Sequence, residues 1–429
     1  MDRSFAIDFE WLQRYSADVI DRYTLADLRI SVGNKIATEL QDISVKTVRP
    51  TMRGSAYDMA VWLLQNWWRL IYEPERDTLD WRMSHCLGAI GKGFLWPDIR
   101  FISDGAEMTI CSRASDPSST HPVRYLNNIY ETTSLDGFGS TVLGFADAVI
   151  ERVRETGTEN SLLHNLREDI RAEESDPEYR HWRQIEALLG YDPDEASDEA
   201  INEVISESLK YGSDSINEVI AFSGKDAGSI FEWMTAARSA GSPLTVPDTE
   251  NLRRKTASIN PSLLPWERAE EAARIARAQW SLSEKPISNE QLKDLFSLKN
   301  SLLSDYNAKG QLSVAFRNGD IEHLEATLTS PHEASRRFSL LRVVADHLYS
   351  PGTDHILPVT KAKTARQKFQ RTFAQEFLCP SRELSAFMGK DYSDDRLEEA
   401  ASYFNVSSLL VKSTLVNKGL LNRDEIIDP

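Results

Sequence analysis

The hydrophobic pattern of the first 155 residues predicts a mixture of helices and short strands. Segments with apolar residues at helical spacing are expected to be helices, and they cover 8–24, 56–72 and 135–155. Segments that alternate apolar and polar residues are expected to be strands, and they cover 28–53, 96–114 and 123–130. A Gly-Asn pair in the first strand segment and Asp104-Gly105 in the second are typical of tight turns. We therefore predict one Trp-rich α+β domain over 1–155.

The remainder of the chain is predicted to be mostly helical. Residues 156–245 are polar and acidic with helical periodicity, and Gly, Ser and Pro collect at 239–250, which indicates a linker. Two strands, 312–318 and 323–330, are expected to pair as a hairpin through Gly319-Asp320. Helices are expected over 265–280, 288–296, 336–348, 363–378 and in a set from 381 onward. This order predicts a third region, 246–429, with a compact, mostly helical α+β fold.

Composition indicates a packed globular protein. The 429 residues are 41% apolar and include ten tryptophans, and no apolar run is long enough to span a membrane. The first residues resemble neither a signal nor a transit peptide, and the three cysteines are far apart, so we expect a cytoplasmic location. The formal charge of −17 disfavours non-specific attraction to nucleic acid, because that attraction depends on basic residues.

The main candidate for chemistry is the segment RRFSLLRVVADHLYSPGTDH, at 336–355. It has the pattern of a buried helix, with one histidine near its end and a second after a turn. A helical zinc peptidase needs two histidines at i and i+4, a glutamate beside the first as general base, and a third ligand from elsewhere. The eight histidines form no H-x-x-x-H pair, so a site of this type requires different ligands here.

The residues around this helix nevertheless resemble the ImmA/IrrE family of bacterial zinc metallopeptidases. The family helix is approximately R-R-F-[ST]-L-x-H-E-x-x-H, and RRFSL at 336–340 reproduces its first part. A later family helix, approximately E-x-x-A-N-x-F-A-x-E-L-L-x-P, is similar to QKFQRTFAQEFLCP at 367–380. The C-terminal FNVS turn, with a helix on either side, also resembles the family's usual ending. The resemblance implies a zincin-related domain in the C-terminal region.

The chain differs from the family at the positions of the zinc ligands and of the general base. The resemblance places the first zinc histidine at Arg342, the general base at Val343, the second histidine at Asp346 and the third ligand at Gln367. Arginine stays protonated, valine cannot move a proton, and glutamine lacks the carboxylate charge, so we expect no zinc catalysis. We expect Arg342 and Asp346, at i and i+4, to form a salt bridge where the family holds its metal.

A rebuilt metal site is the alternative. Its candidate ligands are Asp346, His347, His355 and Glu376, whose side chains are of types that bind zinc. Their spacing matches no named metal motif, and the competing interpretation is that both histidines are ordinary polar residues. We favour the competing interpretation and expect no cofactor, with zinc bound only if such a site is rebuilt.

Two further groups of residues are candidates for binding a partner. Trp67, Trp68 and Arg69 are adjacent on a predicted helix, so their side chains point in different directions and one tryptophan could face a partner. Lys363 and Arg366 belong to a basic segment that could contact phosphate. The simpler interpretations, a wide core face for the tryptophans and a solvated helix face for the basic segment, are favoured.

These patterns predict a non-catalytic regulator that binds another protein. The family resemblance implies settings such as bacterial stress response, toxin–antitoxin control or antiphage defence. One alternative is an active peptidase with a rebuilt metal site that cleaves a repressor or other partner. A second alternative is a DNA-binding regulator, which is disfavoured because the second helix of a helix-turn-helix pattern at 398–420 carries Lys412 as its single charged residue. The oligomeric state is left open.

Overall fold

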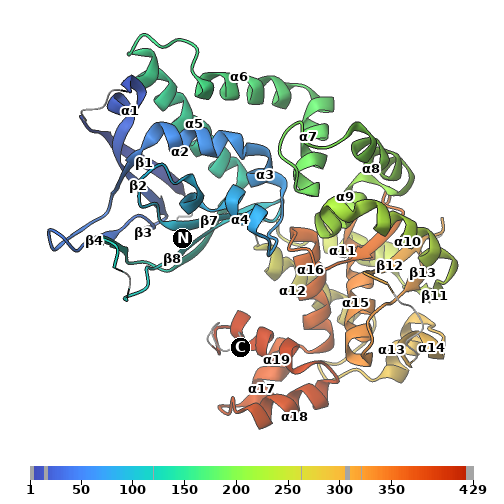
Figure 1. The fold of residues 1–429 in the computed structure, drawn as a ribbon. Coiled ribbons are helices and arrows are strands. Elements are labelled where there is room, and N and C mark those ends of the chain that lie inside the picture. Colours follow the sequence, from blue (N-terminus) through green and yellow to red (C-terminus); the bar gives the residue numbers. More distant parts are fainter. Residues whose placement is uncertain are drawn as a thin grey trace. The chain divides into compact units, whose positions relative to one another are not determined.

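The structure is a computed structural model with a mixed α+β fold (Figure 1). It describes residues 4–13, 18–118, 120–261, 263–304, 310–319 and 321–421. The chain divides into two compact units, Met1–Ile201 (unit 1) and Asn202–Pro429 (unit 2), so the boundaries predicted near 155 and 245 do not coincide with this division. Among the described residues, no helix is both long enough and apolar enough to cross a membrane.

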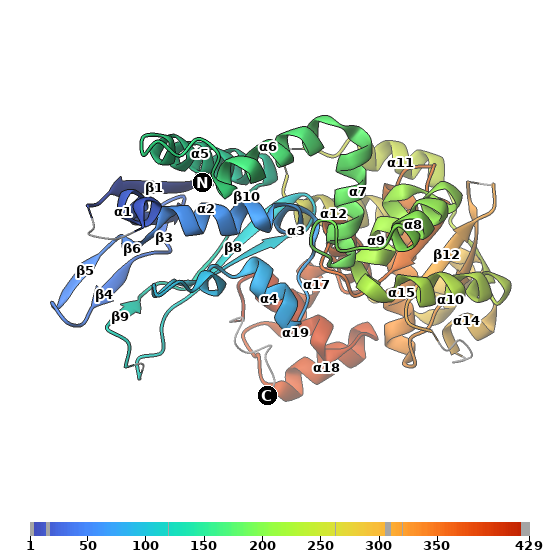
Figure 2. The same ribbon diagram turned by 45° about the horizontal axis from the view of Figure 1, so that its top comes forward.

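The described residues of unit 1 form three small antiparallel sheets. In the first, β2 (Leu25–Val32) pairs with β1 (Phe5–Trp11), β3 (Lys35–Ile36) and β6 (Met52–Ser55). The second has the order β5 (Thr47–Arg49), β4 (Leu40–Asp42), β9 (Val123–Tyr125), and the third has the order β10 (Ile129–Ser134), β8 (Glu107–Arg113), β7 (Asp98–Ser103). The predicted hairpin at 96–114 is confirmed as β7 and β8. Figures 1 and 2 show the β4–β5 hairpin extending away from the helices of this unit.

The helices of unit 1 supply much of its core. They are α1 (Val19–Thr24), α2 (Ala56–Gln65), α3 (Trp67–Tyr72), α4 (Leu79–His85), α5 (Leu135–Arg154), α6 (Leu162–Ser175) and α7 (Pro177–Leu189), with a short 3-10 turn at Leu87–Ile90. The predicted helix at 135–155 is confirmed as α5, which starts at the N-cap Ser134. Phe138, Val142, Phe145 and Val149 recur every three or four residues and are buried, which explains why this segment is helical.

Two predictions for unit 1 are corrected by the structure. The helix expected at 8–24 is wrong for its first part, where β1 pairs with β2 along its whole length. Phe5 and Ile7 are buried at alternate positions, so the segment has the two-residue period of a strand. Residues 14–17 of that predicted helix lie outside the described residues. The helix expected at 56–72 is interrupted at Asn66, between α2 and α3.

In unit 2, the part of the chain that the structure describes forms one four-stranded antiparallel sheet. Its order is β11 (Ser242–Thr245), β13 (His323–Thr327), β12 (Ser313–Arg317), β14 (Ile356–Val359). The predicted pairing of 312–318 with 323–330 is confirmed, although Asp320 of the predicted turn lies outside the described residues. The linker predicted at 239–250 is wrong, because β11 pairs with β13 and the segment is part of the sheet.

The helices of unit 2 include those expected over 265–280, 288–296, 336–348 and 363–378 and in the set from 381 onward, whereas the helices at Thr249–Ala257 and Asn300–Ser304 were not expected. The unit 2 helices are α9 (Ser213–Ser223), α10 (Ala227–Ser239), α11 (Thr249–Ala257), α12 (Pro265–Gln279), α13 (Asn289–Phe296), α14 (Asn300–Ser304), α15 (Glu333–Tyr349), α16 (Ala365–Leu378), α17 (Ser381–Met388), α18 (Asp394–Phe404) and α19 (Ser408–Asn417). A 3-10 turn at Gly224–Asp226 separates α9 from α10, and α8 (Asp198–Tyr211) begins in unit 1 and ends in unit 2.

Helix α15 is central to unit 2. Apolar residues on several of its faces, including Leu340, Val343, Val344 and Leu348, belong to the core. Its neighbours α12 and α16 contribute further core residues, among them Phe373 and Phe377 on α16. Polar residues of α15 are buried as well, from Arg336 to His347. Since a buried polar group is costly unless it is hydrogen-bonded, the partners of these residues define the candidate site.

Candidate functional site

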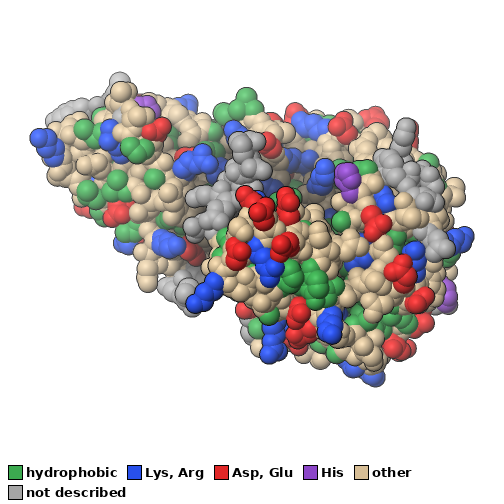
Figure 3. Space-filling view, turned by 90° about the horizontal axis from the view of Figure 1, so that it is seen from below, with side chains coloured by type: hydrophobic (Ala, Val, Ile, Leu, Met, Phe, Trp, Pro, Cys, Tyr) green, Lys and Arg blue, Asp and Glu red, His purple; other side chains and the backbone are tan. Residues whose placement is uncertain are grey.

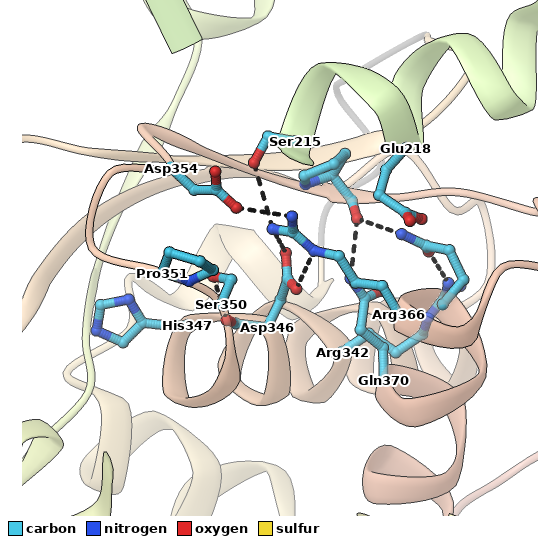
Figure 4. Close-up of polar contacts among 12 residues, drawn as sticks. Ser215, Glu218, Arg342, Asp346, His347, Ser350, Pro351, Asp354, Arg366 and Gln370 are labelled. Atoms are coloured by element: carbon cyan, nitrogen blue, oxygen red, sulfur yellow. Dashed lines mark hydrogen bonds and ion pairs between the residues drawn. The ribbon is translucent and has the colours of Figure 1, made fainter. Parts of the chain in front are cut away.

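Helices α15 and α16 bring together the positions that the family resemblance assigns to zinc ligands. Asp346 and Gln367 are 0% exposed, and Arg342 is also buried. With Arg366, Gln370, Asp354 and two residues of α9, Ser215 and Glu218, they form two neighbouring sets of hydrogen bonds and ion pairs, one around Arg366 and one around Gln367. We call the two sets together the polar centre (Figure 4).

The carboxylate of Asp346 is paired with Arg366. Nε of Arg366 donates to Oδ1 of Asp346 at 2.7 Å and Nη2 donates to Oδ2 at 2.8 Å, which is a bidentate pair. The predicted salt bridge between Arg342 and Asp346 is therefore wrong in its arginine. Arg342 and Asp346 lie one helical turn apart on α15, but the guanidinium that bonds to the Asp346 carboxylate comes from Arg366 of α16, through two parallel hydrogen bonds.

Arg366 contacts two further side chains. Its Nη1 donates to Oδ2 of Asp354 at 2.7 Å, and its Nη2 also lies 3.2 Å from Oγ of Ser215. Burial alone disfavours the charge of Arg366, but Asp346, Glu218 and Asp354 together raise its pKa above the ordinary value. Arg366 is thus a cation surrounded by acceptors, with a side chain that is 11% exposed, and it does not belong to the solvated face predicted for the basic segment.

Arg342 points to the start of α16 and not to Asp346. Its Nη2 donates to the carbonyl oxygen of Thr360 at 2.7 Å and to Oε1 of Gln367 at 2.5 Å. Burial lowers the pKa of Arg342 to about 9, and the nearby Arg371 acts in the same direction. Both polar atoms of the Gln367 side chain are hydrogen-bonded, because Oε1 also accepts from the Thr360 amide and Nε2 donates to the Pro358 carbonyl.

The remaining carboxylate of the centre comes from α9. Oε2 of Glu218 accepts a hydrogen bond of 2.6 Å from Oγ1 of Thr364, the N-cap residue of α16. Burial raises the pKa of Glu218, and the charge of Arg366 opposes this effect. Oγ of Ser215 donates to the Ile356 carbonyl of β14 at 2.7 Å. Helix α9 is therefore bonded to both β14 and the start of α16.

His347 has no ring nitrogen free for a metal. Nε2 lies 2.7 Å from the Ile321 carbonyl and Nδ1 accepts from Nε of Arg317 at 3.3 Å, so the neutral tautomer with a proton on Nε2 satisfies both contacts. Burial lowers the pKa of His347 to about 3, and the charge of Arg317 contributes. The neutral imidazole therefore links α15 to β12 through Arg317 and to the segment after β12 through Ile321.

The other candidate metal ligands do not join His347. The side chain of His355 is exposed, although its backbone bonds to Tyr211. Glu376 lies ten residues beyond Arg366 on α16, about 15 Å along the helix, where it accepts from the Ser381 amide. Within the residues that the structure describes, no three His, Cys, Asp or Glu side chains form a group that could hold a metal ion.

The predicted partner-binding tryptophans lie in the core of unit 1. Trp67 and Trp68 are each 4% exposed, and their indole N–H groups donate to Glu174 and Glu173 of α6. Arg69 is 1% exposed and pairs with carboxylates, which are those of Glu73, Asp80 and Asp192. These three side chains present no free surface, contrary to the hypothesis that one of them anchors a partner. Lys363 is exposed just before α16.

The helix-turn-helix pattern at 398–420 forms as α18 and α19. Lys412 of α19 lies 3.2 Å from the carboxylate of Asp394 at the start of α18. Leu410, Val411 and Leu415 of α19 are buried in the core of unit 2. On the face drawn in Figure 3, Lys and Arg side chains are scattered among Asp and Glu side chains. The packing role predicted for this pair of helices fits these contacts.

Comparison of the chain with family models, with curated proteins and with solved structures gave no match. The class that the fold itself defines is a mixed α+β protein with a buried polar centre in unit 2. Sequence reasoning identified Arg342, Asp346 and Gln367 but missed the parts played by Ser215 and Glu218, which come from α9. The sequence signal that could have indicated their role is the presence of two hydrophilic side chains at the start of an apolar helix, next to Gly212.

Proposed function

We propose that the chain is a catalytically inactive, ImmA/IrrE-like protein that binds another protein and acts as a regulator. What supports the absence of catalysis is the polar centre: the positions that the resemblance assigns to ligands hold a guanidinium, a carboxylate paired with Arg366, and a glutamine amide. The position of the base holds Val343, which is 0% exposed in the apolar core. A metal-bound water would have no general base beside it.

The regulatory role is the function that remains when the chemistry is lost but the scaffold is kept. The resemblance supports a partner of the kind that active family members cleave, in stress response, toxin–antitoxin control or antiphage defence. This chain would bind the partner without cutting it. The polar centre would serve as internal support for the helices that carry the binding surface, because it connects α9, α15, α16 and β14.

Metal analysis tests the absence of a rebuilt zinc site. The full chain, purified after growth with added zinc, is expected to contain far less than one zinc per chain by mass spectrometry of the metal. The matched variant is Asp346→Ala with His347→Ala, which removes two of the candidate ligands. Stoichiometric zinc in the wild type that disappears in this variant would overturn the proposal and favour the peptidase alternative, which the cleavage experiment below then tests.

A binding experiment tests the regulatory role. The tagged chain is used to capture partners from the native host, and each captured protein is then purified and incubated with the chain. We expect a stable complex in which the partner keeps its intact mass over hours. Cleavage of the partner by the wild type but not by the double variant would show a peptidase, and the absence of any purified protein that binds directly would remove the regulatory proposal.

A further inference from the structure

The imidazole of His85 is enclosed in unit 1, between two helices. His85 is the last residue of α4 and is 0% exposed. Its Nδ1 lies 2.8 Å from the carbonyl oxygen of Trp81, and its Nε2 lies 3.2 Å from the carbonyl oxygen of Arg69. Trp81 belongs to α4 and Arg69 belongs to the last turn of α3, so the ring connects the two helices.

Both ring nitrogens of His85 face oxygen atoms that can only accept a hydrogen bond. A neutral imidazole has one N–H group and one nitrogen lone pair, whereas an imidazolium ion has two N–H groups. A neutral ring could therefore donate to one carbonyl alone, and an imidazolium ion can donate to both. His347 in unit 2 differs, because one of its nitrogens faces a carbonyl and the other accepts from the Nε–H of Arg317.

Three features of the surroundings favour a positive charge on the ring. The carbonyl ends of α3 and α4 carry partial negative charge. The indole of Trp81 stacks on the ring, with centroids 4.3 Å apart and an angle of 12° between the planes, and an aromatic face attracts a cation. Oε2 of Glu73, a residue that is 1% exposed, lies 3.9 Å from Nε2 of His85.

Burial works against this charge. Together with the charge of Arg69 it lowers the pKa of His85 to about 3, although the two carbonyls and the charge of Asp80 act in the opposite direction. A ring with that pKa is neutral at pH 7, so two acceptors would lie 2.8 or 3.2 Å apart with no proton between them. A buried acceptor without a donor is costly. The contacts at both nitrogens therefore favour the charged ring.

The charged side chains near the ring come from each element around α4. They are Arg69 of α3, Glu73 and Arg76 of the segment after α3, Asp80 of α4 itself, Asp192 after α7, and Asp98 and Arg100 of β7. The two charges on β7 lie 4.0 Å apart and offset each other. The others comprise three carboxylates and two guanidinium groups, so a positive His85 supplies the third positive charge.

We propose that His85 is an imidazolium ion in the folded chain, that it holds α4 against the last turn of α3, and that loss of its proton as the pH rises releases this contact. The contact makes the stability of unit 1 fall with rising pH. This inference concerns α3 and α4, so its outcome is independent of the proposed regulatory function.

Nuclear magnetic resonance of the full wild-type chain, labelled with ¹⁵N at histidine, tests the charge directly. Both ring nitrogens of His85 are expected to be protonated at pH 7, whereas His347 should show one protonated and one unprotonated nitrogen. His85→Gln identifies the signals by their absence, and nuclear Overhauser contacts with the Trp81 indole identify them if this variant does not fold. An unprotonated ring nitrogen on His85 at pH 7 would refute the proposal.

The pH dependence of stability tests the release of the contact. The unfolded chain loses the histidine proton near pH 6.5, so the stabilisation is complete below this pH and is lost as the pH rises above it. Above pH 6.5, the unfolding constant of the wild type should rise relative to that of His85→Gln by up to about tenfold per pH unit, in urea titrations followed by tryptophan fluorescence.

The matched control is His355→Gln, whose side chain is exposed and which should follow the wild type at every pH. A neutral His85 predicts the opposite sign, because the wild type would then lose its advantage over His85→Gln as the pH falls below 6.5. That result, or an advantage that does not change with pH, would overturn the proposal.

Discussion

Asp346 carries its charge in the interior of unit 2, where a carboxylate is stable only if it is paired and hydrogen-bonded. Arg366 meets this need with two parallel hydrogen bonds. Such a pair adds little to the free energy of unfolding compared with well-packed apolar residues of similar volume. Removal of one partner, however, leaves an uncompensated charge in a medium of low polarity. The energetic importance of the pair therefore shows when one partner is removed.

Replacing Asp346 with asparagine is expected to lower the free energy of unfolding by about 3 kcal/mol, because Arg366 then keeps Asp354 but loses its bidentate partner. Urea midpoints followed by circular dichroism measure this change. The matched control is Asp394→Asn, which removes a carboxylate that is 86% exposed and pairs with Lys412, and its effect should stay within about 0.5 kcal/mol. Similar effects of the two substitutions would contradict the role given to the pair.

His347 makes the stability of unit 2 depend on pH. Its pKa is about 3 in the folded chain and 6.5 in its ordinary state, so the unfolded chain takes up the proton first as the pH falls. Stability is complete above pH 6.5 and is lost progressively as the pH falls toward 3. Between pH 7.5 and 5.5 the wild type should lose about 1.4 kcal/mol more than His347→Gln, whose amide can keep both contacts. Equal losses in urea titrations would contradict this.

Local spacing in the sequence predicted which residues meet at the polar centre but not how they pair. Arg342 and Asp346 are one turn apart, so a salt bridge between them was the natural prediction. The structure pairs Asp346 with Arg366, because Arg342 finds the Thr360 carbonyl and Gln367 instead. The choice depends on how α16 approaches α15, which is tertiary information that one sequence does not contain.

At the scale of elements, helices with strong periodicity and clear ends were predictable. Helices α12, α13, α15 and α16 begin and end within a few residues of the predicted ranges. Strand β1 was not predicted, because its apolar residues also fit a helical period and the pairing with β2 decides the outcome. Strand β11 was mistaken for a linker since Gly, Ser and Pro are common in both loops and edge strands.

The connection from α8 to α9 depends on the close approach of Gly212 to Asp354. Gly212 has a φ of 97°, and an added Cβ would lie 2.9 Å from the backbone of Asp354. Gly212→Ala is therefore expected to destabilise unit 2 by about 1–3 kcal/mol and to speed hydrogen exchange in α9. Gly389→Ala is the control, because Gly389 also has a positive φ but faces open space. Equal exchange in α9 of both variants would contradict the proposed contact.

At the scale of the whole molecule, the net charge of −17 sets the long-range interactions. Acidic residues outnumber basic ones, and Lys412 on α19 is already paired with Asp394. We expect no binding of duplex DNA even at low salt, measured by fluorescence anisotropy with a labelled duplex. Binding that weakens steeply as salt is raised would instead support the DNA-binding alternative, since release of counterions has this signature.

The polar centre also has a consequence for synthesis of the chain. Glu218 precedes its partner Thr364 by 146 residues, and Ser215 precedes Arg366 by 151. A ribosome adds about 5–20 residues each second, so α9 leaves the ribosome roughly 7–30 s before α16. During that interval Glu218 has no buried partner and stays ionised in water. Completion of unit 2 must therefore wait until residue 366 has emerged, after which α9 can close over α15 and α16.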